Sequence, residues 1–193
     1  MTTQGLAAVF AVGLVLAIVL FLLVTSYNAV MALRQRIHKA WANIDVVLKQ
    51  RHDQLPALVS VVRGLMAFEQ DVLTEVAQAR AAYSPTEPIP EQAVHSEQTT
   101  RAVRSLFAVV EAYPQVRSDQ NVLDLQNEIE RLESMIADRR ELYNDQVYRY
   151  NTRIQQLPAN VLAGPFGWQP QPFFAADDSE RARPVVELGL PGA

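Results

Sequence analysis

The sequence of 193 residues contains no cysteine and only three histidines. The absence of cysteine excludes disulfide bonds, thiolate metal sites and an acylated lipoprotein. His38 and His52 are too far apart on one helix to share an ion, and we expect all three histidines, including His95, to be surface or capping residues. The Glu-x-x-His pairs of dimetal helical bundles are also missing. We therefore predict no metal and no cofactor.

Motifs that mark common enzyme classes are missing as well. The chain has no HExxH helix, no glycine-rich phosphate loop and no GxSxG turn. We therefore expect that the protein is not an enzyme. Its formal net charge is −4, so nucleic acid is not an expected partner.

Charge is missing from one long stretch, the run from Leu6 to Val24, which is composed mostly of Leu, Val, Ile, Phe and Ala. At a helical rise of about 1.5 Å per residue the run covers about 28 Å, which matches the hydrocarbon thickness of a bilayer. It predicts a transmembrane helix, with residues 1–26 forming a short tail and the anchor. We therefore expect this part of the chain to lie in a lipid bilayer, which is the first of the partners that the sequence predicts.

A cleaved signal peptide is the alternative interpretation of this run. The leader from Met1 to Gly5 has no basic residue, and the apolar run is longer than a typical signal sequence. Val24, Thr25 and Ser26 form a poor cleavage site. These features favour a retained anchor.

Basic residues follow the anchor and none precedes it. By the positive-inside rule this asymmetry places the short amino terminus outside and the C-terminal domain in the cytoplasm, as in a single-pass membrane protein. The basic residues closest to the anchor are Arg34, Arg36, Lys39, Lys49 and Arg51.

Helical periodicity dominates residues 27–157, which we predict to form one domain. Apolar residues recur in steps of three and four from Leu33 to Ala79, which predicts one long amphipathic helix with a kink or short break at Pro56. A proline-rich connector, 84–90, precedes a second helix over 91–112. A third helix follows capping residues at 118–121 and ends at Leu157. The fold class is therefore all-α: a transmembrane helix followed by an antiparallel up-and-down bundle of three to four long helices.

A series of short motifs runs through the domain and the start of the tail. The motifs are Ala40-Trp41, Ile44-Asp45-Val46, Leu48-Lys49-x-Arg51-x-Asp53, Pro56-x-Leu58-Val59, Ala79-Arg80-Ala81, Tyr113-Pro114, Arg139-Arg140-x-x-Tyr143-Asn144-Asp145, Tyr150-Asn151 and Phe166-Gly167. In their order and spacing, from about Tyr27 to Phe174, they resemble the LemA family of bacterial membrane proteins. The resemblance implies one N-terminal membrane helix, a short outer tail, a cytoplasmic antiparallel bundle and a location in the bacterial cell membrane, and it carries no catalytic residues over to this chain.

Two sets of charged residues within these motifs form a candidate polar cluster. Residues spaced by four stack on one face of the first long helix, and the third helix offers partners for them. The cluster has two interpretations: interhelical ion pairs that align the helices, or a cleft for a ligand or partner. Its members are Asp45, Lys49, Asp53, Arg139, Arg140 and Asp145.

The segment 158–193 begins as a tail rich in proline and aromatic residues, which we expect to fold back on the bundle. Its aromatic rings have three possible roles: closing the open end of the bundle, resting in the lipid interface, or presenting a docking patch. The four rings are those of Phe166, Trp168, Phe173 and Phe174.

Two functions fit this organisation. The first is a membrane-anchored scaffold that recruits a protein partner, with self-association into a homo-oligomer through the small residues of the anchor. The second is a sensor or accessory protein that binds a small ligand or signalling partner at the cluster around Asp45 and Arg139. Ligand-dependent stabilisation would favour the second function, and a reproducible membrane partner would favour the first.

Overall fold

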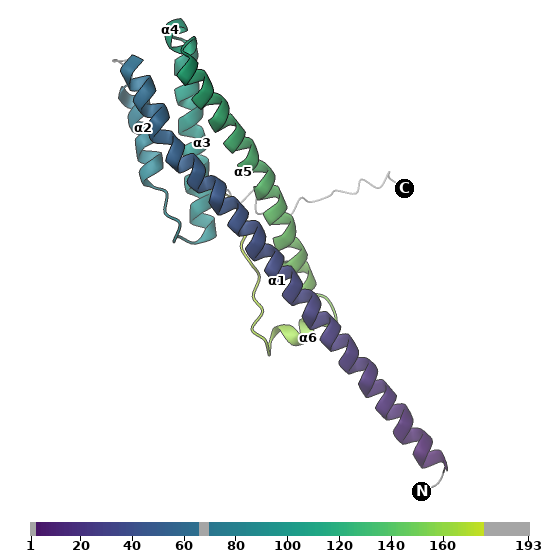
Figure 1. Ribbon diagram of the computed structural model, residues 1–193. Helices are drawn as coiled ribbons and strands as arrows, with labels where there is room; N and C mark the ends of the chain where they lie inside the picture. Colours follow the sequence, from purple (N-terminus) through teal and green to yellow (C-terminus); the bar gives the residue numbers. More distant parts are fainter. Residues whose placement is uncertain (1–2, 66–69, 176–193) are drawn as a thin grey trace, which may run out of the picture. The chain divides into compact units, whose positions relative to one another are not determined.

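The computed structural model describes residues 3–65 and 70–175, which are all-helical apart from turns and loops. The helices are α1 (Thr3–Leu65), α2 (Gln70–Ala81), α3 (Ile89–Glu111), α4 (Pro114–Arg117), α5 (Gln120–Arg153) and α6 (Ala159–Ala163) (Figure 1). This confirms the all-α bundle. The chain divides into two compact units. Unit 1 contains 1–44 and 139–172, and unit 2 contains 45–138 and 173–193, so α1 and α5 contribute to both units.

Unit 2 is a bundle of antiparallel helices around one apolar core. The core takes side chains from the second part of α1, from α2, α3 and α4, and from the first part of α5, as the helical periodicity predicted. Its fully buried members include Leu58, Val76, Leu106 and Ile129. Because every long helix contributes one apolar stripe, the core aligns the helices that carry the polar residues described below.

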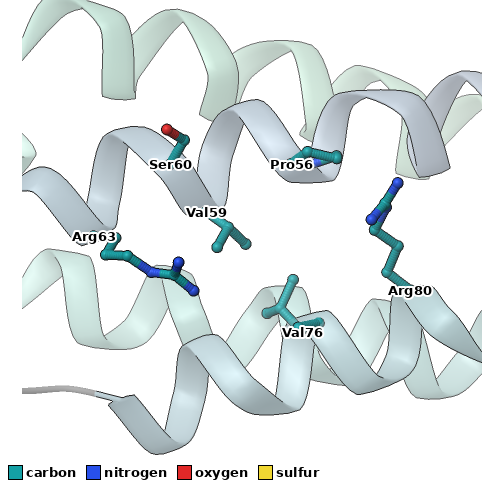
Figure 2. A pocket seen from close by; sticks show the side chains of 7 residues that line it. Pro56, Val59, Ser60, Arg63, Val76 and Arg80 are labelled. Carbon is teal, nitrogen blue, oxygen red and sulfur yellow. The ribbon is translucent and has the colours of Figure 1, made fainter.

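The prediction of a single helix from Leu33 to Ala79 is wrong in one respect, because this range contains two helices, α1 and α2. Pro56 lies inside α1, which continues to Leu65, so the proline does not end the helix. The chain instead reverses direction between α1 and α2. Figure 2 shows the two helices running antiparallel, with Val59 of α1 and Val76 of α2 lining the same groove. The apolar period keeps its phase across the reversal, so periodicity alone could not reveal the turn. Gly64, the penultimate residue of α1, is the local signal that was available.

The start and end of α3 and the start of α5 lie close to the predicted positions, whereas α5 ends at Arg153, before the predicted end at Leu157. α3 ends before Tyr113 and Pro114, and α5 begins after Asp119. The Oδ1 atom of Asp119 accepts hydrogen bonds from the backbone N–H groups of Asn121, at 2.9 Å, and Val122, at 3.2 Å. This carboxylate therefore caps the first turn of α5, which otherwise has N–H donors without partners.

Unit 1 pairs the first part of α1 with the last part of α5. Trp41 and Tyr143 make an edge contact with ring centroids 5.7 Å apart, and an Arg139 nitrogen donates to the Asn43 carbonyl at 2.6 Å. The apolar run of α1 extends from this pair, and its exposed large side chains between Val9 and Val24 have exposed fractions of 47% to 77%. By length and composition α1 is the one described helix suited to crossing a membrane.

Candidate functional site

A buried cation, Arg51, organises the polar residues of unit 2. Arg51 is only 3% exposed, and its guanidinium group donates to the Glu133 carboxylate at 2.7 Å and to the Thr100 hydroxyl at 2.9 Å. The second terminal nitrogen donates to the Ser96 hydroxyl at 2.9 Å and the Ser96 carbonyl at 3.3 Å. The Thr100 hydroxyl lies 2.7 Å from the other oxygen of Glu133. We call these four side chains the Arg51 network.

The Arg51 network joins α1, α3 and α5 through one guanidinium group. Its charge is balanced by Glu133 and its donors are directed at four oxygen atoms, so burial leaves no unpaired cation. In the sequence, Arg51 stood out only as one of the basic residues that follow the anchor and as part of a motif, so its central role was missed. A signal was available: Arg51 lies three residues after Leu48 and four before Leu55, on the buried stripe itself.

His52 and Tyr83 form a second polar cluster in unit 2. Their ring centroids are 4.9 Å apart, and the Tyr83 hydroxyl lies 3.5 Å from an Asp45 carboxylate oxygen. Burial, and then the charge of Arg80, lowers the pKa of His52 from its usual value. Burial, and then Asp45, raises the pKa of Tyr83. His52 is thus not the surface or capping residue that we predicted, because its ring packs on Tyr83 and its Nδ1 atom is buried.

A groove of about 220 Å³ lies between α1 and α2 in unit 2. Its floor is apolar, and Figure 2 shows Arg63 and Arg80 at opposite ends, each extending from its own helix toward the other helix. Within residues 3–65 and 70–175, neither guanidinium has a hydrogen-bond or ion-pair partner. We call this site the arginine groove. It is lined by Pro56, Val59, Ser60, Arg63, Val76, Ala77 and Arg80.

The arrangement of the arginine groove favours an anionic ligand that also has an apolar part. Two cations provide charge complementarity at the ends, and Val59 and Val76 offer a surface for a hydrophobic group between them. The Ser60 hydroxyl adds one donor and acceptor. Sequence reasoning did not find this groove, because it exists only once α1 and α2 are known to pair in opposite directions.

The predicted polar cluster is divided between the two units. Asp45, Lys49 and Asp53 belong to unit 2, whereas the three residues of the third helix belong to unit 1. In unit 2, Asp45 lies beside Tyr83, and the side chains of Lys49 and Asp53 are exposed. The cleft, which was one of the two interpretations of these residues, stays a hypothesis.

In unit 1, the three remaining members have interactions of their own. Arg139 contacts the backbone of α1, as described above, and Arg140 also has a polar interaction. Asp145 accepts two hydrogen bonds from the Nε atom of Arg149, at 2.8 and 3.0 Å, on its own helix. Within this unit Arg139 thus joins α5 to α1 and Asp145 stabilises its own helix, and the interpretation of the cluster as interhelical ion pairs stays a prediction.

The tail begins by folding back in unit 1, where two motif residues hold it. The Asn151 side chain donates to the Gln171 carbonyl at 2.9 Å and accepts from the Gln171 N–H at 2.8 Å. The Tyr143 hydroxyl donates to the Pro172 carbonyl at 2.9 Å, and burial raises the pKa of Tyr143 to about 12. Tyr143 and Asn151 of α5 therefore clamp the tail.

The four aromatic residues of the tail are divided between the two units, as the predicted polar cluster is. Trp168 is buried in unit 1, whereas Phe166 is 54% exposed although its ring stacks on that of Trp168. Phe173 and Phe174 belong to unit 2, where Phe174 is buried and Phe173 is partly buried. Most of the predicted tail patch is therefore packed rather than displayed, and residues 176–193 of the tail lie outside the described part.

Comparison with known proteins decides the family. The LemA family model matches residues 40–188, a range that starts within α1 beyond the apolar run. The chain belongs to the LemA family. None of the curated proteins compared with this LemA protein matches it. The Arg51 network, the arginine groove and the clamp on the tail all lie inside the matched range, whereas the apolar run lies before it.

Proposed function

We propose that this LemA protein is a membrane-anchored interaction module rather than an enzyme. The exposed apolar run of α1 would span the bilayer once and hold the bundle at the cytoplasmic face of the bacterial cell membrane. The exposed large apolar side chains between Val9 and Val24, each exposed by 47% or more, support the anchor, and the basic residues after the run support the orientation.

The arginine groove is the observation that carries this proposal. Its two guanidinium groups have no partner in the described chain and flank an apolar floor, so the groove offers what an acidic peptide segment with a hydrophobic side chain requires. We therefore propose a protein partner that presents such a segment. Self-association through the small residues of the anchor would bring two copies of the groove together.

Site-specific photocrosslinking in intact membranes tests the proposed partner. A photoreactive residue at Ala77, inside the groove, should capture an acidic segment that mass spectrometry then identifies. The double variant Arg63→Glu/Arg80→Glu should lose that adduct because its groove repels acidic side chains. Arg104→Glu changes an exposed charge of α3 outside the groove and should keep the adduct.

Two results would contradict the proposal. The first is an equal yield of the same adduct from the double variant, because charge would then have no part in recognition. The second is the absence of any reproducible adduct at Ala77 in native membranes.

A screen of thermal stability against small metabolites tests the alternative function, in which a ligand binds at the cluster around Asp45 and Arg139. A ligand that binds the folded protein raises its melting temperature.

A further inference from the structure

Three large apolar side chains on and beside α6 in unit 1 are exposed. Leu157 is 74% exposed, Val161 is 59% exposed and Phe166 is 54% exposed. They lie just before α6, inside it and just after it, so one short segment carries all three. An apolar group of this kind outside the membrane anchor indicates a surface that another apolar phase covers. We call these three side chains the interface patch.

The segment that carries the interface patch has no charge. No acidic or basic residue occurs between Arg153 and Asp177. Aspartate, glutamate, lysine and arginine are the side chains that oppose contact with lipid most strongly, so their absence removes the main cost of bringing this segment to a bilayer. Glutamine, asparagine and backbone groups can still be hydrated in the headgroup layer.

Ring contacts place this segment beside the end of the anchor. Tyr27 comes three positions after Val24, so it lies about 4.5 Å further along the helix axis. Its ring centroid is 5.0 Å from that of Phe166 and 5.9 Å from that of Trp168. Each headgroup layer of a bilayer is about 5–7 Å thick, so an anchor ending near Val24 places these rings at the level where Tyr and Trp are enriched.

The position of the segment is fixed by the protein itself. Asn151 and Tyr143 of α5 hold its far end through the hydrogen bonds to Gln171 and Pro172. Figure 1 shows α6 beside α1, near the apolar part of that helix. The interface patch is therefore already positioned next to the lipid that surrounds the anchor, and binding it would require no rearrangement of the chain.

We propose that the interface patch is a second membrane contact, in which α6 and its flanking residues lie in the headgroup layer of the bilayer that α1 crosses. The occupant of the patch is the lipid surface, because the contacts of Phe166 and Trp168 with Tyr27 hold the uncharged segment beside the end of the anchor. This contact would fix the tilt of unit 1 at the membrane, which a single spanning helix leaves free. The inference rests on the proposed anchor.

The depth of spin labels in vesicles tests the second contact, and the lack of cysteine allows single labels without removing native thiols. The full chain is reconstituted into phosphatidylcholine vesicles containing phosphatidylglycerol, with the label at Val161→Cys. Leu142→Cys is the aqueous control, since Leu142 is 50% exposed and precedes Tyr143, which contacts Trp41, about 25 Å beyond Val24. Leu16→Cys is the control within the bilayer.

Collisions with oxygen and with a water-soluble nickel complex report the depth of each label. Relative to the label at 142, the label at 161 should collide less with nickel and more with oxygen, and a second label at Leu157→Cys should agree. A label at 161 as accessible to nickel as the label at 142, while the label at 16 is in lipid, overturns the second contact alone. A label at 161 shielded from both reagents also overturns it, because protein then covers the patch. A label at 16 in water overturns the anchor, and the second contact with it.

Discussion

Arg51 shows how a single side chain can fix the alignment of three helices. A long cation at a position of the buried stripe would destabilise a core of leucine and valine unless every donor found a partner. In unit 2 the carboxylate of Glu133 supplies the countercharge, and the hydroxyls of Ser96 and Thr100 complete the coordination. Because these partners come from α3 and α5, shifting either helix along α1 would break the network.

Replacing Arg51 should destabilise the bundle strongly. Arg51→Met leaves Glu133 without its countercharge in a partly buried position, and breaking a buried pair in this way costs about 3–5 kcal/mol. Denaturant unfolding of the full chain in detergent measures the loss. Arg101→Met, which removes an exposed ion pair with Glu97, should cost about 1 kcal/mol or less.

The double variant Arg51→Met/Glu133→Leu should regain part of the stability that Arg51→Met loses, since it leaves no buried charge unpaired. If Arg51→Met costs no more than Arg101→Met, the network does not hold the helices together.

His52 should make the stability of the bundle depend on pH. Its folded-state pKa is lowered, so the unfolded chain takes up a proton first as the pH falls below about 6.5, and stability is lost on acidification. His52→Phe keeps a ring against Tyr83 and has no proton to bind, so the melting temperature of this variant should fall less between pH 7 and pH 5. His38→Phe alters an exposed histidine of the same helix and should behave like the unmodified chain. Equal falls in all three proteins would contradict this role for His52.

At the scale of elements, the sequence indicates where some helices begin and end, but it does not indicate which helices pack against each other. The end of α3 and the start of α5 could be predicted because Pro114 and Asp119 act on the residues next to them, whereas α5 ends at Arg153, before Pro158. The reversal between α1 and α2 could not, because the apolar spacing continues through it and only the packing of Val59 near Val76 reveals it. The arginine groove depends on that pairing, so it was equally out of reach.

The cap on α5 provides a test at this scale. Asp119→Ala leaves two backbone N–H groups at the start of the helix without their acceptor and should cost about 1 kcal/mol of unfolding free energy. Asp138→Ala removes an exposed carboxylate from a later turn of α5 and should change the unfolding free energy by less than half as much. Thermal unfolding followed by circular dichroism compares the two variants. Equal effects would show that the carboxylate of Asp119 does not act as a cap.

For the whole molecule, the composition and spacing of the sequence predicted the fold class, whereas contacts between residues far apart in the sequence could not be predicted. An uncharged run and regular helical spacing sufficed to predict an all-α chain with an apolar N-terminal helix. The partners of Tyr27, which are the rings of Phe166 and Trp168, lie far along the sequence. The sequence therefore left three roles open for the aromatic tail, and the fold adds that its first part lies in unit 1 and that Phe174 is buried in unit 2.

Orientation in the membrane is testable with single cysteines in a chain that has none of its own. Gln4→Cys should react with an impermeant maleimide in spheroplasts, where the outer face of the cell membrane is accessible, because the positive-inside rule places it outside. Val46→Cys, which is 53% exposed, should react only after the cells are lysed. The reverse pattern would place the bundle outside the cell and contradict the proposed location of the arginine groove.

The most direct test of the account is the intact mass of the protein recovered from native membranes after washing with alkaline carbonate. The account predicts that the protein stays with the lipid and that its mass includes the whole apolar run from Leu6 to Val24. A protein released into the wash, with a mass showing that it begins after Ser26, would contradict it.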